Sequence, residues 1–261
     1  VGFVHAGTTG RGRSHTITQS PMQTPARSTK RVAIVQSNYV PWKGYFDMIR
    51  QVDEFILLDG VQYTRRDWRN RNRIKTPRGT AWLTIPVKVT GRYLQSIRET
   101  EISDAGWAEN HWRRLESAYA RAPHFAAHAP RLEALYRAAA RRRLLCDVNR
   151  MFLEEVCAML GIATRLSVDS DYHAEGTKTE RLVALCRAAG ATDYLSGPAA
   201  RDYLDPARFD DAGIGLSWMD YAGYPEYPQL HPPFDHAVSV LDLLFHTGHE
   251  AARYLERGPA T

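Results

Sequence analysis

A short apolar run followed directly by polar side chains constrains this chain more than any other feature. Residues 32–35 are rich in β-branched side chains and predict a buried strand. Gln36, Ser37 and Asn38 follow, and Pro41 stands where a helix can begin, because proline is tolerated in a first turn. In open α/β sheets, ligands bind outside the carboxyl ends of the strands. We therefore expect Gln36 and Asn38 at a ligand-binding edge.

Strand and helix patterns alternate along the rest of the chain. Further apolar runs predict strands at residues 55–58, 165–168, 193–195 and 214–219. Apolar residues at helical spacing predict helices at residues 107–121, 132–140, 147–160, 179–189 and 239–245. This order predicts an α/β fold, with a Rossmann-like three-layer core, a mainly parallel sheet and a helical portion at about 105–160.

Residues 69–75 combine four basic side chains with two asparagines. With a strand period of two, one face carries Arg69, Arg71, Arg73 and Lys75, and the other carries Asn70, Asn72 and Ile74. A turn at 77–79 and an apolar strand at 81–87 complete an inserted antiparallel hairpin. Four cations on one face indicate either a phosphate or carboxylate site or a solvated edge strand protected by its charge. The asparagines favour the anion site, since they are poor strand formers.

Two residues are candidates for catalysis. Asp59 follows the second strand, where a carboxylate can hold a hydroxyl, a metal or an amine, or can cap the next turn. His111 lies on the apolar side of the helix at 107–121, where a histidine is either catalytic or a hydrogen-bonded core residue. Either residue could be the general base that deprotonates an acceptor amine or hydroxyl.

Two more segments contribute candidates. Thr177 or Thr179 begins a helix whose free N–H groups favour an anion, with Lys178 adding charge, although a plain helix cap explains the same residues. Asp242, His246 and His249 share one helix face, which permits a metal, but surface positions are the simpler interpretation and we expect no metal site.

Charge and composition narrow the functional classes. The 261 residues carry a net charge of +5, but residues 1–30 contain four basic and no acidic residues, so the rest carries only about +1. General nucleic-acid binding is therefore not expected. No apolar run approaches a membrane span or a secretory signal, so we expect a cytoplasmic protein. Residues 1–30 predict a disordered tail and residues 31–261 a single domain, with three reduced cysteines.

Several motifs, in order, resemble one protein family. Gln36-Ser-Asn-Tyr-Val-Pro-Trp-Lys-Gly-Tyr-Phe-Asp47, Trp68-Arg-Asn-Arg-Asn-Arg-Ile-Lys75, Lys178-Thr-Glu-Arg-Leu182 and Tyr194-Leu-Ser-Gly-Pro198 are similar to the WbqC-like family, a likeness that runs from about residue 31 to 248. Asp59-Gly60 departs from the acid pair common at that place. The resemblance implies a context of bacterial O-antigen and other polysaccharide biosynthesis, with transfer of glycine or another acyl group to a sugar.

Two functional hypotheses follow. The first is a transferase that acts on a phosphorylated small molecule such as a nucleotide sugar or an acyl donor, and the second is a non-catalytic binding protein for such a metabolite or for a partner enzyme. Neither the cofactor nor the oligomeric state is indicated. The candidate substrate-binding residues are Gln36, Asn38, Tyr39, Trp42, Gln62, Arg69, Asn70, Arg71, Asn72, Lys75, Lys178, Thr179, Arg181, Ser196, Gly197, Tyr203 and Gln229.

Overall fold

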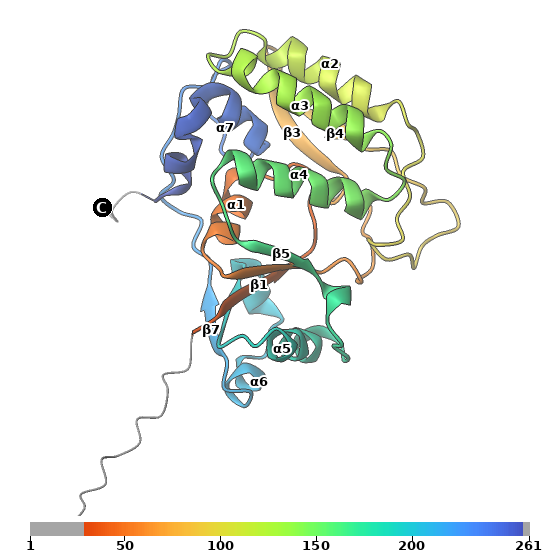
Figure 1. The fold of residues 1–261 in the computed structure, drawn as a ribbon, viewed down its shortest axis with the longest axis vertical. Helices are drawn as coiled ribbons and strands as arrows, with labels where there is room; N and C mark the ends of the chain where they lie inside the picture. The colour runs from red at the N-terminus through yellow and green to blue at the C-terminus, as the bar shows by residue number, and fades with distance from the viewer. Residues whose placement is uncertain (1–28, 258–261) are drawn as a thin grey trace, which may run out of the picture.

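A five-stranded, all-parallel sheet forms the centre of the computed structural model, which describes residues 29–257 (Figure 1). Its strands, in the spatial order β5-β2-β1-β6-β7, are Arg165–Val168, Glu54–Leu57, Arg31–Val35, Asp193–Ser196 and Gly215–Trp218. From the central β1, the sheet extends through β2 and β5 to one side and through β6 and β7 to the other. This arrangement confirms the predicted Rossmann-like α/β fold.

Helices cover both faces of the sheet, which gives the three predicted layers. Figure 1 shows α1 (Lys43–Arg50) and α4 (Leu145–Met159) on one face, and α5 (Lys178–Ala188) and α6 (Pro206–Asp210) on the other. The strand residues alternate accordingly. Phe55 and Leu57 belong to the core cluster on the α1 side, whereas Ile56 belongs to the cluster on the α5 side. Short 3₁₀ helices complete this part at Asp169–Asp171, Pro198–Asp202 and Gly248–Leu255.

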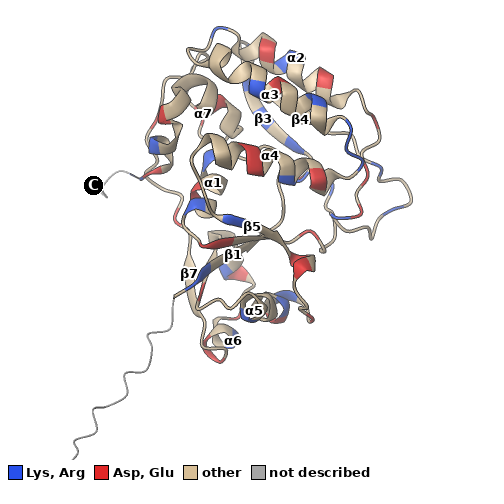
Figure 2. Cartoon of the chain, viewed as in Figure 1, with Lys and Arg blue, Asp and Glu red and all other residues tan. Residues whose placement is uncertain are grey.

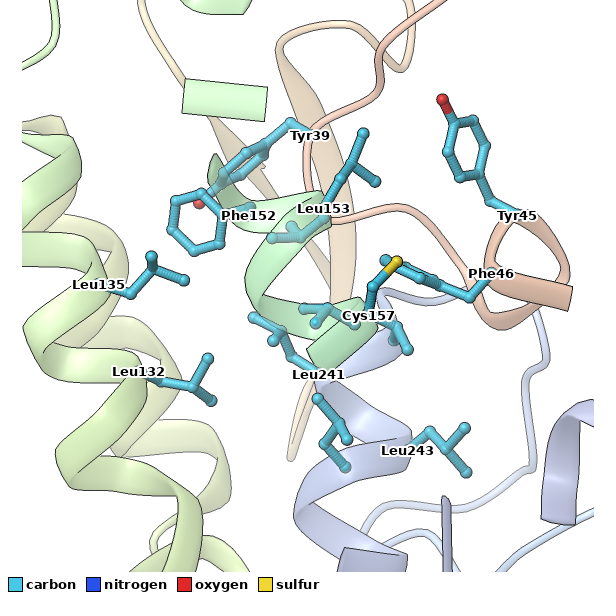
Figure 3. Close-up of a cluster of buried hydrophobic side chains, with 14 of the residues drawn as sticks. Tyr39, Tyr45, Phe46, Leu132, Leu135, Phe152, Leu153, Cys157, Leu241 and Leu243 are labelled. Atoms are coloured by element: carbon cyan, nitrogen blue, oxygen red, sulfur yellow. The ribbon is translucent and has the colours of Figure 1, made fainter. Parts of the chain in front are cut away.

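The inserted hairpin and the helical portion lie on the side of α4 that faces away from the five-stranded sheet (Figure 1). Strands β3 (Arg71–Thr76) and β4 (Gly79–Thr84) pair in antiparallel register and make their own two-stranded sheet, as predicted. Helix α2 (Trp107–Tyr119) packs against β3, helix α3 (Phe125–Ala139) packs against α2, and helix α7 (Val240–Thr247) packs against α3. Figure 3 shows the apolar side chains of α1, α3, α4 and α7 meeting in one core, so the hairpin is attached to the sheet domain through continuous packing.

Two helices begin earlier than their sequence patterns predict. Helix α3 starts at Phe125 and continues through Pro130, because Phe125 packs against Trp112 and Phe245, with ring centroids 5.9 and 5.0 Å apart. Helix α4 starts at Leu145 rather than at residue 147, and Asp147 lies in its first turn, where a negative charge suits the helix dipole. Tertiary contacts therefore decide where α3 begins.

The described residues begin at the end of the predicted N-terminal tail. The predicted tail lies outside the described residues except for Thr29 and Lys30, and the Lys30 ammonium already bonds Glu54 at 2.7 Å. Within residues 29–257, no helix is long and apolar enough to cross a membrane.

Cys146, Cys157 and Cys186 are free thiols, and burial raises the pKa of each to about 12. They are therefore poor nucleophiles at neutral pH.

Candidate active site at the carboxyl edge of the sheet

The polar residues after β1 lie where the strand order of the sheet reverses. Strand β1 has β2 on one side and β6 on the other, and the carboxyl ends of the three parallel strands carry Asn38, Asp59 and Ser196. The Ser37 backbone N–H donates to Asp59 Oδ1 at 3.0 Å, which ties the ends of β1 and β2 together. Such a reversal point is where open α/β sheets bind ligands.

Arg69 closes this edge from the hairpin side. Its two terminal nitrogens donate to the amide oxygens of Asn38 and Gln36, and it pairs with Asp67 at 3.4 Å. Because the guanidinium has only donors, it fixes which end of each amide faces it. The NH₂ groups of Gln36 and Asn38 remain as hydrogen-bond donors for another molecule.

Asp59 is the buried carboxyl of the edge, with only 3% of its surface exposed. Burial raises its pKa, and the neighbouring Asp169 charge raises it further. Hydrogen bonds from Ser37 and the Arg69 charge act in the opposite direction but do not cancel the increase. A carboxyl with a raised pKa is a stronger base than an ordinary carboxylate and is therefore better suited to accept a proton from a substrate.

A pocket of about 260 Å³ opens beside Asn38. The Trp42 indole forms one wall and lies over the start of α1. A Cβ on Gly44 would come within 2.3 Å of this indole, so the close approach requires glycine. The pocket is lined by Asn38, Pro41, Trp42, Trp68, Asn72 and Ala237. It therefore combines two indoles with amide groups.

The turn between Asn38 and Trp42 is strained and is held by the hairpin. Val40 has φ = +35°, which is unfavourable for a β-branched residue. The Asn72 amide donates to the carbonyls of Tyr39 and Val40 at 3.2 and 2.9 Å. The Tyr39 N–H donates to the Trp68 carbonyl at 3.1 Å. The hairpin thus fixes the backbone that carries the pocket residues.

The other hairpin cations bind protein groups. The Arg71 guanidinium lies 4.1 Å from the Trp82 ring and donates to the Arg66 carbonyl. Arg73 donates to the Ala237 carbonyl at 2.7 Å, and the buried Lys75 ammonium donates to the Pro233 carbonyl. Figure 2 shows the positive segments along β3. Carbonyls of segment 233–237 thus accept hydrogen bonds from two of the four cations. Arg69 is the cation that reaches the sheet edge.

His111 lies in the core and is only 2% exposed. Its Nδ1 is 2.9 Å from the Tyr39 hydroxyl and its Nε2 is 3.1 Å from the Thr84 carbonyl. Since a carbonyl only accepts, Nε2 carries the proton and Nδ1 accepts from Tyr39. Burial lowers the pKa of His111 to about 4, so the ring is neutral at pH 7. Tyr39 is itself fully buried and also contacts the Tyr136 hydroxyl at 2.8 Å.

The remaining predicted residues are distributed over three places. The Asn70 and Gln229 side chains bond inside the fold, to the Ile85 carbonyl and to Asp242. Gln62 and Tyr203 are exposed on loops away from the pocket lining, and Gln62 donates to the Tyr93 carbonyl. The others lie near the carboxyl edge or at the start of α5, and they are Lys178, Thr179, Arg181, Ser196 and Gly197. Their roles in binding stay predictions.

Sequence reasoning did not select Asp169 or the two exposed tryptophans. Asp169 follows β5 and accepts from Arg98, from Arg181 at 2.8 Å and from the Gly60 N–H at 3.1 Å. The rule that selected Asp59, an acid directly after a strand, could have found it. Trp68 and Trp82 carried no such signal, because an indole next to a strand is usually buried.

Among residues 29–257, no group of three or more histidine, cysteine, aspartate or glutamate side chains is placed to hold a metal ion. Asp242 instead accepts hydrogen bonds from Tyr119 and Tyr227, at 2.8 and 2.9 Å. His246 Nε2 accepts from the Leu230 N–H at 3.0 Å. Both side chains therefore anchor segment 224–236 to α7.

Comparison with known proteins gives a family without an activity. The model of the WbqC-like protein family matches residues 36–254. The chain is 54% identical over 226 residues to a protein of Mycobacterium tuberculosis (strain ATCC 25618 / H37Rv) named "Uncharacterized protein Rv1507c", which covers 87% of this chain and 97% of the relative. No solved structure matches.

Proposed function

This chain belongs to the WbqC-like protein family, and we propose that it is a group-transfer enzyme whose active site is the carboxyl edge of the sheet between β1 and β2. The reaction would move an acyl group, such as glycyl, from a phosphorylated donor to a hydroxyl or amine of a sugar in surface-polysaccharide or related biosynthesis. The observation that carries the proposal is the buried Asp59, a carboxyl with a raised pKa. It accepts a hydrogen bond from the Ser37 N–H, between the two amide residues that Arg69 holds.

Asp59 is the general base in this mechanism. It removes the proton from the acceptor hydroxyl or amine, whose oxygen or nitrogen then forms a bond to the acyl carbon. The bond from the acyl carbon to its phosphate leaving group breaks, and the leaving group departs with the electron pair. His111 is not assigned this role, because both of its ring nitrogens bond core groups.

The NH₂ groups of Gln36 and Asn38 and the Arg69 charge support the transition state. They offer donors to the acyl oxygen, on which negative charge develops during attack. Arg69 keeps both amides in one orientation, so these donors are in place before the substrate binds. Catalysis would rest on positioning and charge stabilisation, without a covalent enzyme intermediate.

The pocket limits the size of the group that enters. Its volume of about 260 Å³ lies just below the roughly 300–1,000 Å³ of pockets that enclose a drug-sized ligand. It suits one sugar ring or a short acyl group between Trp42 and Trp68. The remainder of the substrate would extend outside the pocket.

A ligand screen followed by one matched pair of variants tests this function. Thermal shift with nucleotide sugars, ATP and coenzyme A should identify a ligand, since one at 100 times its Kd stabilises by about 2.7 kcal/mol. Mass spectrometry with acyl donors and sugar acceptors then detects the product. Asp59→Asn should keep ligand binding and lose turnover by roughly 100-fold or more, whereas His111→Gln should retain turnover. Full turnover in Asp59→Asn would refute the assignment.

The alternative is a non-catalytic protein that binds a phosphorylated metabolite or a partner enzyme. The low exposure of Asp59 favours it, because a base must come within hydrogen-bond reach of its substrate. Ligand binding without any product, in the wild type as well as in Asp59→Asn, would support this alternative.

A further inference from the structure

Trp68 and Trp82 form an exposed aromatic surface outside the pocket. Their side chains belong to residues that are 40% and 39% exposed, although tryptophan is highly buried on average. The two rings contact each other, with centroids 5.5 Å apart and planes inclined by 40°. Contiguous exposed apolar surface is a feature of ligand-binding grooves and interaction sites.

This surface is continuous with the pocket, and hydrogen bonds hold its backbone. Trp68 also lines the pocket, so the two share a wall. The backbone of Trp68 accepts from the Tyr39 N–H at 3.1 Å, and the Trp82 carbonyl accepts from Arg114 of α2 at 2.8 Å. Arg71 covers part of the Trp82 ring at 4.1 Å. The contact between the two rings and the Arg71 guanidinium over Trp82 restrain the indoles, which lowers the cost of ordering them on binding.

The geometry of the rings selects the kind of ligand. The Trp68 and Trp82 rings contact each other, with centroids 5.5 Å apart, so no flat base can be sandwiched between them. Side by side, the indoles form an open platform flanked by a guanidinium. A sugar ring fits such a platform, because its C–H face packs on an indole while its hydroxyls accept hydrogen bonds at the edge.

We propose that Trp68 and Trp82, with Arg71, form an extended subsite for an oligosaccharide acceptor whose terminal sugar occupies the pocket. The next sugar rings would cross Trp68 and reach Trp82. This inference rests on the proposed function, since it needs a sugar in the pocket. It explains why a pocket for a single ring is joined to two exposed indoles.

Binding of defined glycans to the full chain tests the subsite. An array of mono- to tetrasaccharides of common bacterial hexoses and deoxyhexoses gives the ligands, and calorimetry gives their Kd values. The wild type should bind di- or trisaccharides about tenfold more tightly than the matching monosaccharide. Trp82→Ala should remove this gain and leave monosaccharide binding unchanged. Trp82→Phe should give an intermediate loss, which guards against misfolding of the alanine variant.

Tyr93→Ala is the matched control, because Tyr93 is an exposed aromatic residue away from the pocket lining. It should bind every glycan as the wild type does. Monosaccharide binding without a gain for longer glycans would overturn the subsite and leave the proposed function intact, whereas no binding of any glycan would overturn both. Trp82-dependent binding of UMP or AMP alone, or Trp82-dependent self-association in sedimentation velocity, would also overturn the subsite.

Discussion

Asp59 and Asp169 occupy equivalent places at the ends of the adjacent parallel strands β2 and β5, yet their surroundings differ. Asp169 bonds Arg98 and Arg181 and the Gly60 N–H, so its charge is balanced within the protein. Asp59 bonds the Ser37 N–H, and burial raises its pKa. An acid at the carboxyl edge is therefore not functional by position alone. The groups around it separate a structural carboxylate from one available for proton transfer.

The largest expected effect is the loss of the Asp169 charge. Asp169→Asn leaves the partly exposed Arg98 and Arg181 without their shared carboxylate, and we expect the free energy of unfolding to fall by about 2 kcal/mol. Urea unfolding at pH 7 measures this change. Asp202→Asn, at an exposed position, is the control and should change stability by less than about 0.5 kcal/mol. Equal effects of the two substitutions would remove the contrast between Asp169 and Asp59.

His111 adds a pH dependence that must be separated from that of Asp59. Its folded-state pKa of about 4 lies below its ordinary value of 6.5, so its contribution to stability is complete above pH 6.5 and is lost as the pH falls toward 4. We expect a loss of roughly 2 kcal/mol over this interval.

His111→Gln should remove most of that acid sensitivity. A glutamine can accept from the Tyr39 hydroxyl and donate to the Thr84 carbonyl, as the neutral imidazole does, but it does not titrate. Thermal melts between pH 4 and 8 measure the difference between the two proteins. Parallel pH profiles would show that His111 is not the titrating group.

Gly60 links the two aspartates and gives a smaller effect. A Cβ at this position would lie 2.5 Å from Asp169 Oδ2 and 2.8 Å from an Arg181 nitrogen. Gly60→Ala should therefore displace the Asp169 pairs and lower the free energy of unfolding by about 1–2 kcal/mol. Combined with Asp169→Asn in a double-mutant cycle, the two changes should be less than additive, because both act on the same contacts. Full additivity would contradict a shared cause.

The sequence predicted the sheet better than the site. The central strands β1 and β2 are short apolar runs followed by polar residues, and this local pattern survives because a central parallel strand is buried on both faces. The equally local period of β3 correctly separated its cationic face from its asparagine face, apart from the buried Lys75. The partners of those cations could not be predicted. Segment 233–237, which binds Arg73 and Lys75, lies about 160 residues away in the chain.

The same limit explains why the surroundings of His111 and Asp169 could not be predicted from the sequence. The helical period correctly placed His111 on the apolar side of α2, but that period does not reveal whether this side meets a pocket or the core. Only the tertiary contacts with Tyr39 and Thr84 decide between the two. Likewise, the identity of an acid after a strand does not reveal whether arginines surround it, as they surround Asp169.

Asp59→Asn gives the smallest change in stability and the sharpest test of the comparison. Because the folded-state pKa of Asp59 is raised, its contribution to stability is present below pH 3.8 and is lost as the pH rises through the folded value. An asparagine avoids burying this charge, and its oxygen can still accept from the Ser37 N–H. At pH 8 the variant should be at least as stable as the wild type, and any gain should shrink toward pH 4. Thermal melts at both pH values measure this difference. Both proteins should also carry His111→Gln, so that the titration of His111 does not contribute to the pH dependence. A strong destabilisation at pH 8 would mean that Asp59, like Asp169, holds the fold together rather than being kept for chemistry.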